Sequence, residues 1–437
     1  MKGVLNPFLR AEGGAVAVYF ALLAPILIAF AALGAEAGLW LITERKLQQI
    51  ADASAYSAAA RHMSTQNLTV LEQAARASAT ASGMVADDEF ALYLPPQSGG
   101  FVGQSAYVQV AISREVPRYF SGLFAGTNAP VQISVRAVAG TDPDSGEPVC
   151  MLALSPSASP AFGVGGAGVV NVTECALSSN SSASNSFDMI GARVSVTGSC
   201  LYSVGGVDVS DGLHLTDCTE PQILQRPTAN PFASLMLPTS AEIGGLIPRS
   251  SSSMTGTYTP SEALLAYPDL PAALFSGGLT IQGTVNLARG IYIVDGGTMK
   301  INANAVLSGT GVSFYLINGA KLDVAGGALL NVSAYDSSNP NIRTDPFAGL
   351  LFFSDGVGTP VSHSISGNSA SQTNGVIYFP EDKLTYIGNS GSAYPCLQIM
   401  ASTLTISGSG TLNIGCFPDL PPGTGQIRAN QRIALVE

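Results

Sequence analysis

Residues Gly14–Gly38 read GAVAVYFALLAPILIAFAALGAEAG, and this stretch decides how the rest of the chain is interpreted. No charged residue occurs between Ala15 and Ala35, a run of about 21 residues that would extend roughly 31 Å as a helix and could cross a bilayer core. Ala35-Glu36-Ala37 also fits a small-residue cleavage site, so a cleaved signal peptide stays an alternative. The apolar run is longer than a signal core, and the helical pattern continues without a break to Ala60. Both features favour a retained membrane anchor.

Four residues mark the expected membrane helix and its outer end. Gly14 begins the apolar segment, and Pro25 should kink the helix because it removes a backbone hydrogen bond. Glu36 is expected as a solvated carboxylate at the bilayer surface, and the alternative is a pairing partner in a membrane assembly. Trp40 fits an interfacial aromatic belt as well as an ordinary core position.

The side of the membrane that carries the rest of the chain is indicated by the cysteines. Two basic residues precede the apolar run and two follow it closely, so the positive-inside rule does not decide the orientation. All six cysteines lie after residue 149, in an even set without a C-x-x-C pair, which is typical of disulfides in an oxidising compartment. We therefore expect the N-terminus inside the cell and the bulk of the chain outside the cytoplasm.

Composition limits the partners and the fold class. The chain has 437 residues, which predicts two or three domains, and only 11% of them are charged, against a norm of about 25%. Gly, Ser, Asn and Thr replace the missing charge, which is typical of β-rich proteins outside the cytoplasm. The net charge is −11 and the region after the membrane helix has no basic cluster, so nucleic acid is not expected as a partner.

Hydrophobic periodicity divides the chain into four parts, and the predicted fold class is mostly β with an N-terminal α part. A long apolar helix is followed by a mixed region and then by short apolar runs separated by Gly, Ser and Asn. The expected parts are a cytoplasmic leader at 1–13, a transmembrane helix with its extension at 14–64, a pilin-like α+β module at 65–145, and a right-handed β-helix or β-solenoid-like domain at 146–437.

The α+β module is predicted from an alternation of helical and strand patterns. Residues 68–83 are Ala-rich and end in Gly, as a helix does, and a short second helix is expected at 116–125. Residues 105–113 and 130–140 alternate apolar and polar side chains, as strands do. The C-terminal segment 426–437 ends in another alternating strand, which is expected to close the solenoid and cover its edge.

Two families of short apolar segments recur after residue 278 and predict the solenoid. Corresponding positions of the second family recur about every 18 to 26 residues, which is the length of one coil of a β-solenoid. Many prolines between residues 219 and 277 mark a linker or an excursion, and the apolar side chains there favour an excursion packed along the solenoid. The first family comprises LTIQG (279–283), MKINA (299–303), LDVAG (322–326), HSISG (363–367) and LTISG (404–408), and the second comprises GIYIV (290–294), GVSFY (311–315), LNVSA (330–334), GLLFF (349–353), GVIYF (375–379) and CLQIM (396–400).

The cysteine spacing predicts three disulfides. Cys150 and Cys175 are 25 residues apart, as are Cys175 and Cys200, and residues one coil apart would lie on adjacent strands about 4.8 Å from each other. Each disulfide would close a loop of about 20 to 25 residues, worth on the order of 3 kcal/mol in the chain-entropy model. The expected pairs are Cys150–Cys175, Cys200–Cys218 and Cys396–Cys416.

These features resemble the TadE/TadG-like family of Flp (tight-adherence) pilus-assembly proteins, and in particular its long TadG-like members. Such proteins carry a G-[AN]-x-A-x-x-F-A-L-x-x-P segment, which residues 14–25 match as GAVAVYFALLAP. They also carry an L-Q-x-x-A-D-A-x-A-x-x-A-A stretch, which residues 47–59 match as LQQIADASAYSAA. Pilin-like members have a Glu a few residues after the processed Gly, whereas the fifth residue after Gly14 is Tyr19, so a permanent anchor is expected. Further similar segments are VPRYFSGLF (116–124), CMLALSPSAS (150–159) and GVIYFP (375–380).

No catalytic, cofactor or metal site is expected in this chain. β-Helices host carbohydrate-active enzymes, whose sites need clustered carboxylates or a basic residue on one face. Lys300 and Asp323 fall in the first repeat family and are interpreted as an exposed cross-strand pair. Asp208 and Asp211 are interpreted as part of a turn in preference to a Ca²⁺ site. The three histidines lie far from one another, and the cysteines include no C-x-x-C pair, which argues against zinc.

The resemblance implies a membrane-anchored structural component of Tad/Flp pilus assembly, whose partners are other Tad/Flp pilus-assembly proteins and the lipid bilayer. It also implies a single-pass protein of the bacterial inner membrane, with a cytoplasmic N-terminus and a periplasmic bulk. The alternative is a surface-displayed adhesin that binds envelope or surface glycans. Its aromatic row would be formed by Tyr292, Tyr315, Tyr335 and Tyr378, although buried positions are favoured for them. A carbohydrate-active β-helix enzyme is the least favoured interpretation.

Overall fold

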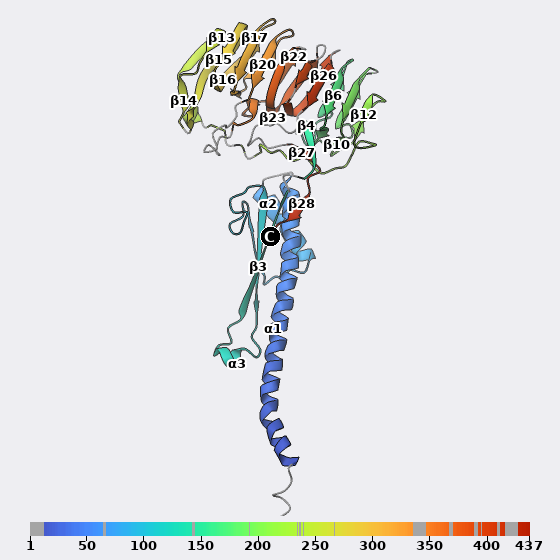
Figure 1. Cartoon of the computed structure of the whole chain (residues 1–437), viewed down its shortest axis with the longest axis vertical. Helices are drawn as coiled ribbons and strands as arrows, with labels where there is room; N and C mark the ends of the chain where they lie inside the picture. Colours follow the sequence, from blue (N-terminus) through green and yellow to red (C-terminus); the bar gives the residue numbers. More distant parts are fainter. Residues whose placement is uncertain are drawn as a thin grey trace, which may run out of the picture. The chain divides into compact units, whose positions relative to one another are not determined.

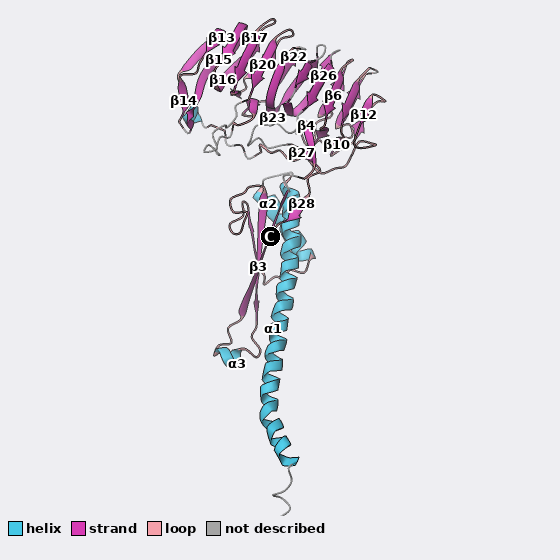
Figure 2. Cartoon of the chain, in the orientation of Figure 1, coloured by secondary structure: helices cyan, strands magenta, loops and turns pink. Residues whose placement is uncertain are grey.

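The chain folds into two compact units. One comprises the N-terminal part up to Asp142 together with Ile433–Glu437, and the other comprises the chain between them. Helix dominates the first unit and strand the second, as the predicted fold class requires (Figure 2). The structure is a computed structural model, and it describes residues 13–63, 67–141, 145–191, 193–233, 235, 237–238, 240–265, 267–334, 347–366, 370–388, 392–394, 396–408, 411–415 and 427–437.

The first unit is built on one long helix, α1, which spans the 50 residues Gly13–His62 (Figure 1). Its second half buries side chains at helical spacing, among them Leu47, Ile50 and Ala55, in a core shared with a second helix and a sheet. Its first half has no such cover, and Leu39 is half exposed. The helix therefore has a packed C-terminal part and an N-terminal part, up to Ile42, whose large apolar side chains are exposed.

The packed half of α1 lies against a four-stranded antiparallel sheet with the order β1–β2–β3–β28. The second helix begins after Asn67, whose side-chain oxygen accepts a hydrogen bond from the Thr69 N–H and so caps the helix. Small and aliphatic side chains of α1, the second helix, β2 and β3 form the core. The elements are α2 (Leu68–Ala81), β1 (Glu89–Tyr93), β2 (Tyr107–Val116), the short helix α3 (Gly122–Ala125), β3 (Val131–Thr141) and β28 (Ile433–Leu435).

The C-terminal strand does not close the solenoid, so that prediction is wrong. β28 instead pairs antiparallel with β3, which would otherwise present an open sheet edge. The chain end is held there because the Glu437 carboxylate accepts a hydrogen bond from the Gly100 N–H at 2.6 Å and pairs with Arg136 at 2.7 Å. From this segment only β27 (Arg428–Ala429) joins the solenoid, where it pairs antiparallel with β4.

The second unit is a β-solenoid of about ten turns, in which strands of successive turns pair in parallel. Its described strands form a 19-stranded sheet and a five-stranded sheet. The elements are β4 (Glu147–Ala153), β5 (Phe162–Gly165), β6 (Val169–Thr173), β7 (Ala176–Ser179), β8 (Phe187–Ile190), β9 (Ser195–Gly198), β10 (Leu201–Ser203), β11 (Val207–Asp208), β12 (Leu213–Leu215), α4 (Ser240–Ile243), β13 (Pro248–Tyr258), β14 (Glu262–Leu264), β15 (Tyr267–Leu287), β16 (Gly290–Ile301), β17 (Val306–Thr310), β18 (Val312–Ile317), β19 (Lys321–Val324), β20 (Leu329–Ser333), β21 (Leu350–Ser354), β22 (Ser362–Ser366), β23 (Gln372–Gly388), β24 (Ser392–Tyr394), β25 (Cys396–Gly408), β26 (Thr411–Gly415) and β27.

The strand register confirms the first repeat family. Leu279 lies opposite Met299, and Met299 lies opposite Leu322, so the family stacks in successive turns. One further turn, which the repeat pattern does not reveal, places Leu384 of β23 between His363 and Leu404.

The second repeat family is confirmed with one exception. Tyr292 lies opposite Phe314, Phe314 opposite Phe352, and Phe352 opposite Ile377. The segment LNVSA (330–334) belongs elsewhere, because β20 pairs with β17 and β23 in a different column of strands. Both columns read as short apolar segments at similar intervals, so the sequence pattern alone does not separate them.

The chain enters the solenoid in the middle and not at an end. Strands β4 to β12 stack outward to one end, a return segment within 219–247 connects to the other end, and β13 to β26 stack back toward the middle (Figure 1). There β25 pairs in parallel with β4, with Ile399 opposite Met151, and β26 pairs with β6. The first and last turns in the sequence are therefore neighbours in space.

The predicted Pro-rich excursion at 219–277 is shorter than expected. Its first part packs on the solenoid and buries Phe232, Ile243 and Leu246. From Pro248 onward the chain forms β13, β14 and β15 at the end of the stack. Prolines are compatible with these strands because edge strands have N–H groups that need no partner within the sheet.

The strands beneath this excursion are buried on both faces. Phe314 and Phe352 belong to the interior core, with ring centroids 4.9 Å apart. The neighbouring residues Tyr315 and Phe353 point to the other face, where they pack in one cluster with Phe232 of the excursion. Burial on both faces explains why these strands read as nearly continuous apolar runs.

Candidate functional site

The first half of α1 exposes large apolar side chains around its circumference. The helix includes Gly14 and is continuous through Pro25, where the sequence predicts a kink. The described helix segment Val18–His62 is long and apolar enough to cross a membrane, by length and composition. A helix that is apolar all round and uncovered indicates lipid or protein surroundings. The large exposed residues are Val18, Tyr19, Phe20, Leu22, Leu23, Ile26, Leu27, Ile28, Phe30, Leu39, Leu41 and Ile42.

Glu36 lies one residue beyond the uncharged run, and its carboxylate is covered by the connection between β2 and β3. Oε1 accepts hydrogen bonds from the Tyr119 N–H at 2.8 Å and from the Ser121 hydroxyl at 3.0 Å. Oε2 accepts from the Phe120 N–H at 3.0 Å and from the Ser121 N–H at 2.6 Å. Only 1% of Glu36 is exposed, so the expectation of a solvated carboxylate is wrong. A loop more than 80 residues later in the chain folds onto the helix and supplies the donors that water would supply.

The loop that Glu36 holds is the tip of the β2–β3 hairpin, residues Arg118–Gly126, which we call the hairpin tip. It contains α3, which is shorter than the helix predicted at 116–125 and ends at Gly126 with a left-handed φ of 67°. The compact turn leaves large apolar side chains on its outside, with exposed fractions from 45% to 84%. They are Tyr119, Phe120, Leu123 and Phe124.

Trp40 lies one helical turn beyond Glu36 and contacts the same hairpin. The guanidinium of Arg118 lies over the Trp40 ring, with its Cζ atom 5.9 Å from the ring centroid. Arg118 also donates a hydrogen bond from Nε to the Ala129 carbonyl at 3.0 Å. The Trp40 indole N–H is buried and has no acceptor within the described part of the chain. Trp40 is therefore partly buried against the hairpin.

The hairpin is also fixed nearer its base. Arg114 of β2 binds Asp88 through two hydrogen bonds, Nε to Oδ1 at 2.6 Å and Nη2 to Oδ2 at 2.7 Å. Burial opposes ionisation of Asp88. The hydrogen bond from Arg114 and the positive charge of its guanidinium outweigh burial and lower the pKa of Asp88. On the other side, Gln48 of α1 donates from Nε2 to the Arg136 carbonyl at 2.9 Å. These contacts fix the strands β2 and β3, whereas the tip beyond them is held by Glu36 and by the contact between Arg118 and Trp40.

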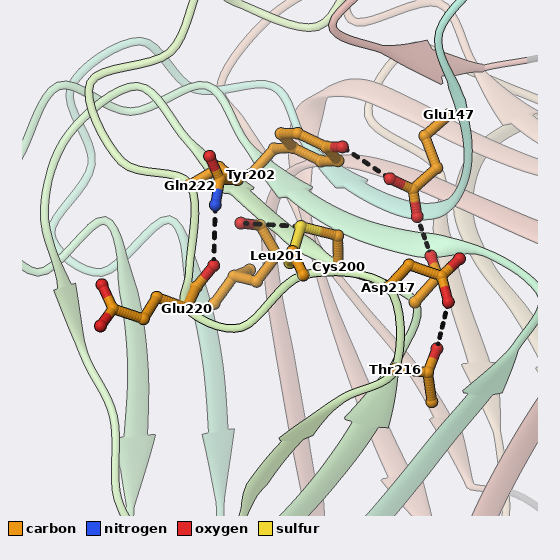
Figure 3. Close-up of a disulfide and its surroundings, with 10 residues drawn as sticks. Glu147, Cys200, Leu201, Tyr202, Thr216, Asp217, Glu220 and Gln222 are labelled. Atoms are coloured by element: carbon orange, nitrogen blue, oxygen red, sulfur yellow. Dashed lines mark hydrogen bonds between the residues drawn. A yellow bond between two sulfur atoms is a disulfide. The ribbon is translucent and has the colours of Figure 1, made fainter.

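Two of the three expected disulfides lie within the described residues. Cys150 pairs with Cys175 across a Cα–Cα distance of 5.7 Å, and Cys200 pairs with Cys218 across 5.4 Å. Beside the second pair, Figure 3 shows the Tyr202 hydroxyl directed at Glu147, whose Oε2 accepts its hydrogen bond at 2.6 Å. The third expected pair, Cys396–Cys416, involves side chains outside the described residues.

One buried cluster of His, Asp and Ser in the solenoid has the residue types of a hydrolase triad. His363 Nε2 lies 3.2 Å from Asp382 Oδ2, and the Ser354 hydroxyl donates to the same oxygen at 2.6 Å. His363 Nδ1 accepts the Leu322 N–H at 3.0 Å, so neither imidazole nitrogen is directed at the hydroxyl. A nucleophilic serine would have to contact the imidazole, so this arrangement is structural. The sequence did not reveal it, because His363 is a single residue in an ordinary repeat.

The other residues considered for chemistry are dispersed. Lys300 and Asp323 lie opposite each other in β16 and β19, as the repeat predicts. Within the described residues, no group of three or more His, Cys, Asp and Glu is arranged to hold a metal ion, and this includes Asp208 and Asp211. Of the tyrosines proposed for glycan binding, Tyr335 lies outside the described residues, and the buried ones are Tyr292, Tyr315 and Tyr378.

Comparison with known proteins finds a similarity in the helix α1. Residues 13–61 match the family model described as putative Flp pilus-assembly TadE/G-like. No curated protein and no solved structure matches the chain. The matched residues coincide with α1, so the similarity covers both the exposed and the packed half of this helix and does not extend to the solenoid.

Proposed function

Because residues 13–61 carry the TadE/G-like Flp pilus-assembly domain, we propose that the protein is a structural component of Tad pilus assembly, held by α1 in the inner membrane with its bulk in the periplasm. Its partners are other proteins of the same pilus-assembly system. The observation that carries the proposal is the division of α1 into two halves. The exposed apolar half suits a bilayer, and the packed half builds a folded unit just beyond it.

The disulfides support the periplasmic orientation. Cys150–Cys175 and Cys200–Cys218 join neighbouring turns of the solenoid, and such bonds form and persist in oxidising compartments. If α1 crosses the membrane once, the solenoid lies on the side opposite to residues 1–13. The disulfides then require the solenoid to lie in the oxidising compartment, which in this proposal is the periplasm, and residues 1–13 to lie in the cytoplasm.

The solenoid acts, in this proposal, as a rigid structural body without catalysis. Its only His-Asp-Ser cluster within the described residues has the contacts of a structural network. A glycan-binding adhesin is less well supported, because the described tyrosines of the expected aromatic row are buried. Sugar stacking would need these rings at the surface.

The test determines which envelope fraction contains the full chain and at which residue the mature chain begins. Envelope fractions are separated, the mature N-terminus and the intact mass without reductant are measured, and spheroplasts are treated with protease. We expect an unprocessed chain in the inner membrane, oxidised at its cysteines and degraded from outside. Cleavage after Ala37 with release of the chain would refute the anchor.

A pair of variants makes the test specific. Leu23→Arg places a charge in the middle of the uncharged run, which costs about 2.5–3.5 kcal/mol of insertion free energy. Leu265→Arg adds the same charge at a solenoid residue that is 73% exposed. We expect only Leu23→Arg to reduce membrane retention and pilus formation, and equal behaviour of the two variants would contradict the proposed role of α1.

A further inference from the structure

We propose that the hairpin tip enters the outer interface of the bilayer beside α1 and gives the protein a second membrane contact. The inference rests on the proposed membrane anchoring by α1. Its occupant is lipid, at the boundary between acyl chains and headgroups. That layer accepts aromatic and aliphatic side chains from one side of a segment while its polar groups stay hydrated.

The height of the tip follows from its attachment to Glu36. The uncharged run of α1 ends at Ala35, so the acyl region ends near this residue when the helix crosses the membrane. Glu36 is the next residue, and it binds the backbone N–H groups of residues 119–121 at 2.6 to 3.0 Å. The tip is thereby fixed where α1 leaves the apolar core, in an interfacial layer of about 5–10 Å.

The side chains of the tip suit this layer. Leu123 is 84% exposed, and Phe124 and Tyr119 are more than half exposed. The segment has a single charged residue, Arg118, whose guanidinium is turned back over Trp40 and toward the Ala129 carbonyl. A long cationic side chain beside an aromatic ring at this height can reach headgroup phosphates while its stem stays in the apolar layer.

The surface of α1 around the tip favours lipid over a protein partner. Exposed apolar residues continue past Glu36 to Leu39, Leu41 and Ile42, so the helix stays suited to lipid for about 9 Å beyond the uncharged run. The tip carries exposed apolar side chains of the same kind and is bonded to Glu36 of this helix. Glu36 is compatible with the layer because both of its oxygens accept hydrogen bonds. Glu36 is a positioning residue for the tip.

The experiment measures contact with lipid at three positions of the full chain in lipid nanodiscs, each tested by adding one cysteine to the native six. Leu123→Cys reports on the tip, Ile28→Cys on the helix, and Val102→Cys on an exposed loop residue of the same unit. Each is labelled with an environment-sensitive fluorophore without reductant, and the unmodified chain labelled in parallel gives the background. Two quencher lipids are used, one with its nitroxide just below the headgroup, the depth expected for the tip, and one with its nitroxide further along the acyl chain, the depth expected for Ile28.

The expected result is strong quenching at Leu123 and Ile28 and little at Val102. Adding Glu36→Gln should lower the quenching at Leu123 toward that at Val102 and leave Ile28 unchanged, because the amide places donors against the loop N–H groups. Unchanged quenching at Leu123 in that variant would overturn the positioning role of Glu36.

Three other outcomes separate this inference from the proposed function. Quenching at Ile28 with Leu123 as unquenched as Val102 would overturn the second membrane contact and leave the anchor in place. Disulfide cross-linking between Leu123→Cys copies without quenching would overturn it in favour of a contact between chains. Absence of quenching at Ile28 would overturn the anchor itself, and with it this inference.

Discussion

Replacing Phe352 with Ala is expected to loosen the middle of the solenoid without affecting the first unit. Phe352 is fully buried in β21, where its ring stacks on Phe314 with centroids 4.9 Å apart and planes 13° apart. It lies opposite Phe314 in β18 and Ile377 in β23. Truncation therefore leaves a cavity between two turns and removes one ring from an aromatic stack.

The size of the effect follows from this burial. A buried Phe→Ala change costs about 3–5 kcal/mol, and loss of a ring pair contributes about 0.5–1.5 kcal/mol of that. Since 1.4 kcal/mol is a factor of ten, local opening should increase on the order of 10²–10³-fold. Turns of a solenoid interact only with their neighbours, so the increase should be largest in β18, β21 and β23.

Hydrogen exchange of the full chain, followed by mass spectrometry of peptides, measures this opening strand by strand. Tryptophan fluorescence would not serve, because the chain has one Trp, and Trp40 belongs to the first unit. The control is Val357→Ala, which removes an apolar side chain that is 64% exposed after the same strand and should change stability by less than about 0.5 kcal/mol.

Two results would refute the reasoning. One is exchange in β18 and β23 that equals that of the unmodified chain, because the ring would then contribute nothing between turns. The other is equal acceleration in β2 and β3, because the effect would then not be confined to the solenoid.

Three further predictions concern other contacts of the solenoid. Cys200→Ser leaves Cys218 unpaired and should lower the free energy of unfolding by on the order of 3 kcal/mol, because a loop of 18 residues is no longer closed. Urea unfolding followed by circular dichroism measures this change, and an unchanged midpoint would contradict the pairing. Burial opposes ionisation of Asp382, but its hydrogen bonds outweigh this and lower its pKa. The ionised Asp382 therefore contributes its full stabilisation above the unfolded pKa of about 3.9, and this stabilisation is lost as pH falls through the folded pKa. Asp382→Asn should accordingly make Tm fall less steeply below about pH 4. A Tm profile identical to that of the unmodified chain would contradict this role of Asp382. Phe232→Ala should expose Tyr378, whose ring lies 5.2 Å from that of Phe232, to nitration measured by mass spectrometry, and continued protection would count against the excursion as its cover.

The features predicted correctly from the sequence are those encoded in short stretches. The membrane-length helix follows from one uncharged run, and the solenoid follows from apolar segments repeated at the length of a coil. The two described disulfides follow from spacing, because Cys150 and Cys175 are one coil apart and strands of adjacent coils are paired. Each of these features depends on residues that are close together in the chain or that recur at a regular spacing in the sequence.

The features that the sequence did not reveal depend on contacts between distant segments. Glu36 reads as a surface carboxylate because its donors lie more than 80 residues away. β28 could pair with any open strand edge, and its alternation does not name β3 as the partner. The sequence favours buried positions for Tyr315 and Tyr378, but it does not show that Phe232, from the distant excursion, packs in the same cluster as these tyrosines.

The central entry of the chain into the solenoid has a consequence for how the protein is made. The turns β4 to β12 can stack as soon as they are synthesised or, in the proposed topology, exported, but the free edge of β4 has to wait for β25. The Gln398 side chain that bonds the Val149 carbonyl across this junction lies 249 residues later. Until it arrives, a parallel strand edge is open to pairing with other chains. Folding of the solenoid should therefore be limited by delivery of its last turns, and chains truncated before β25 should aggregate although their early turns are complete.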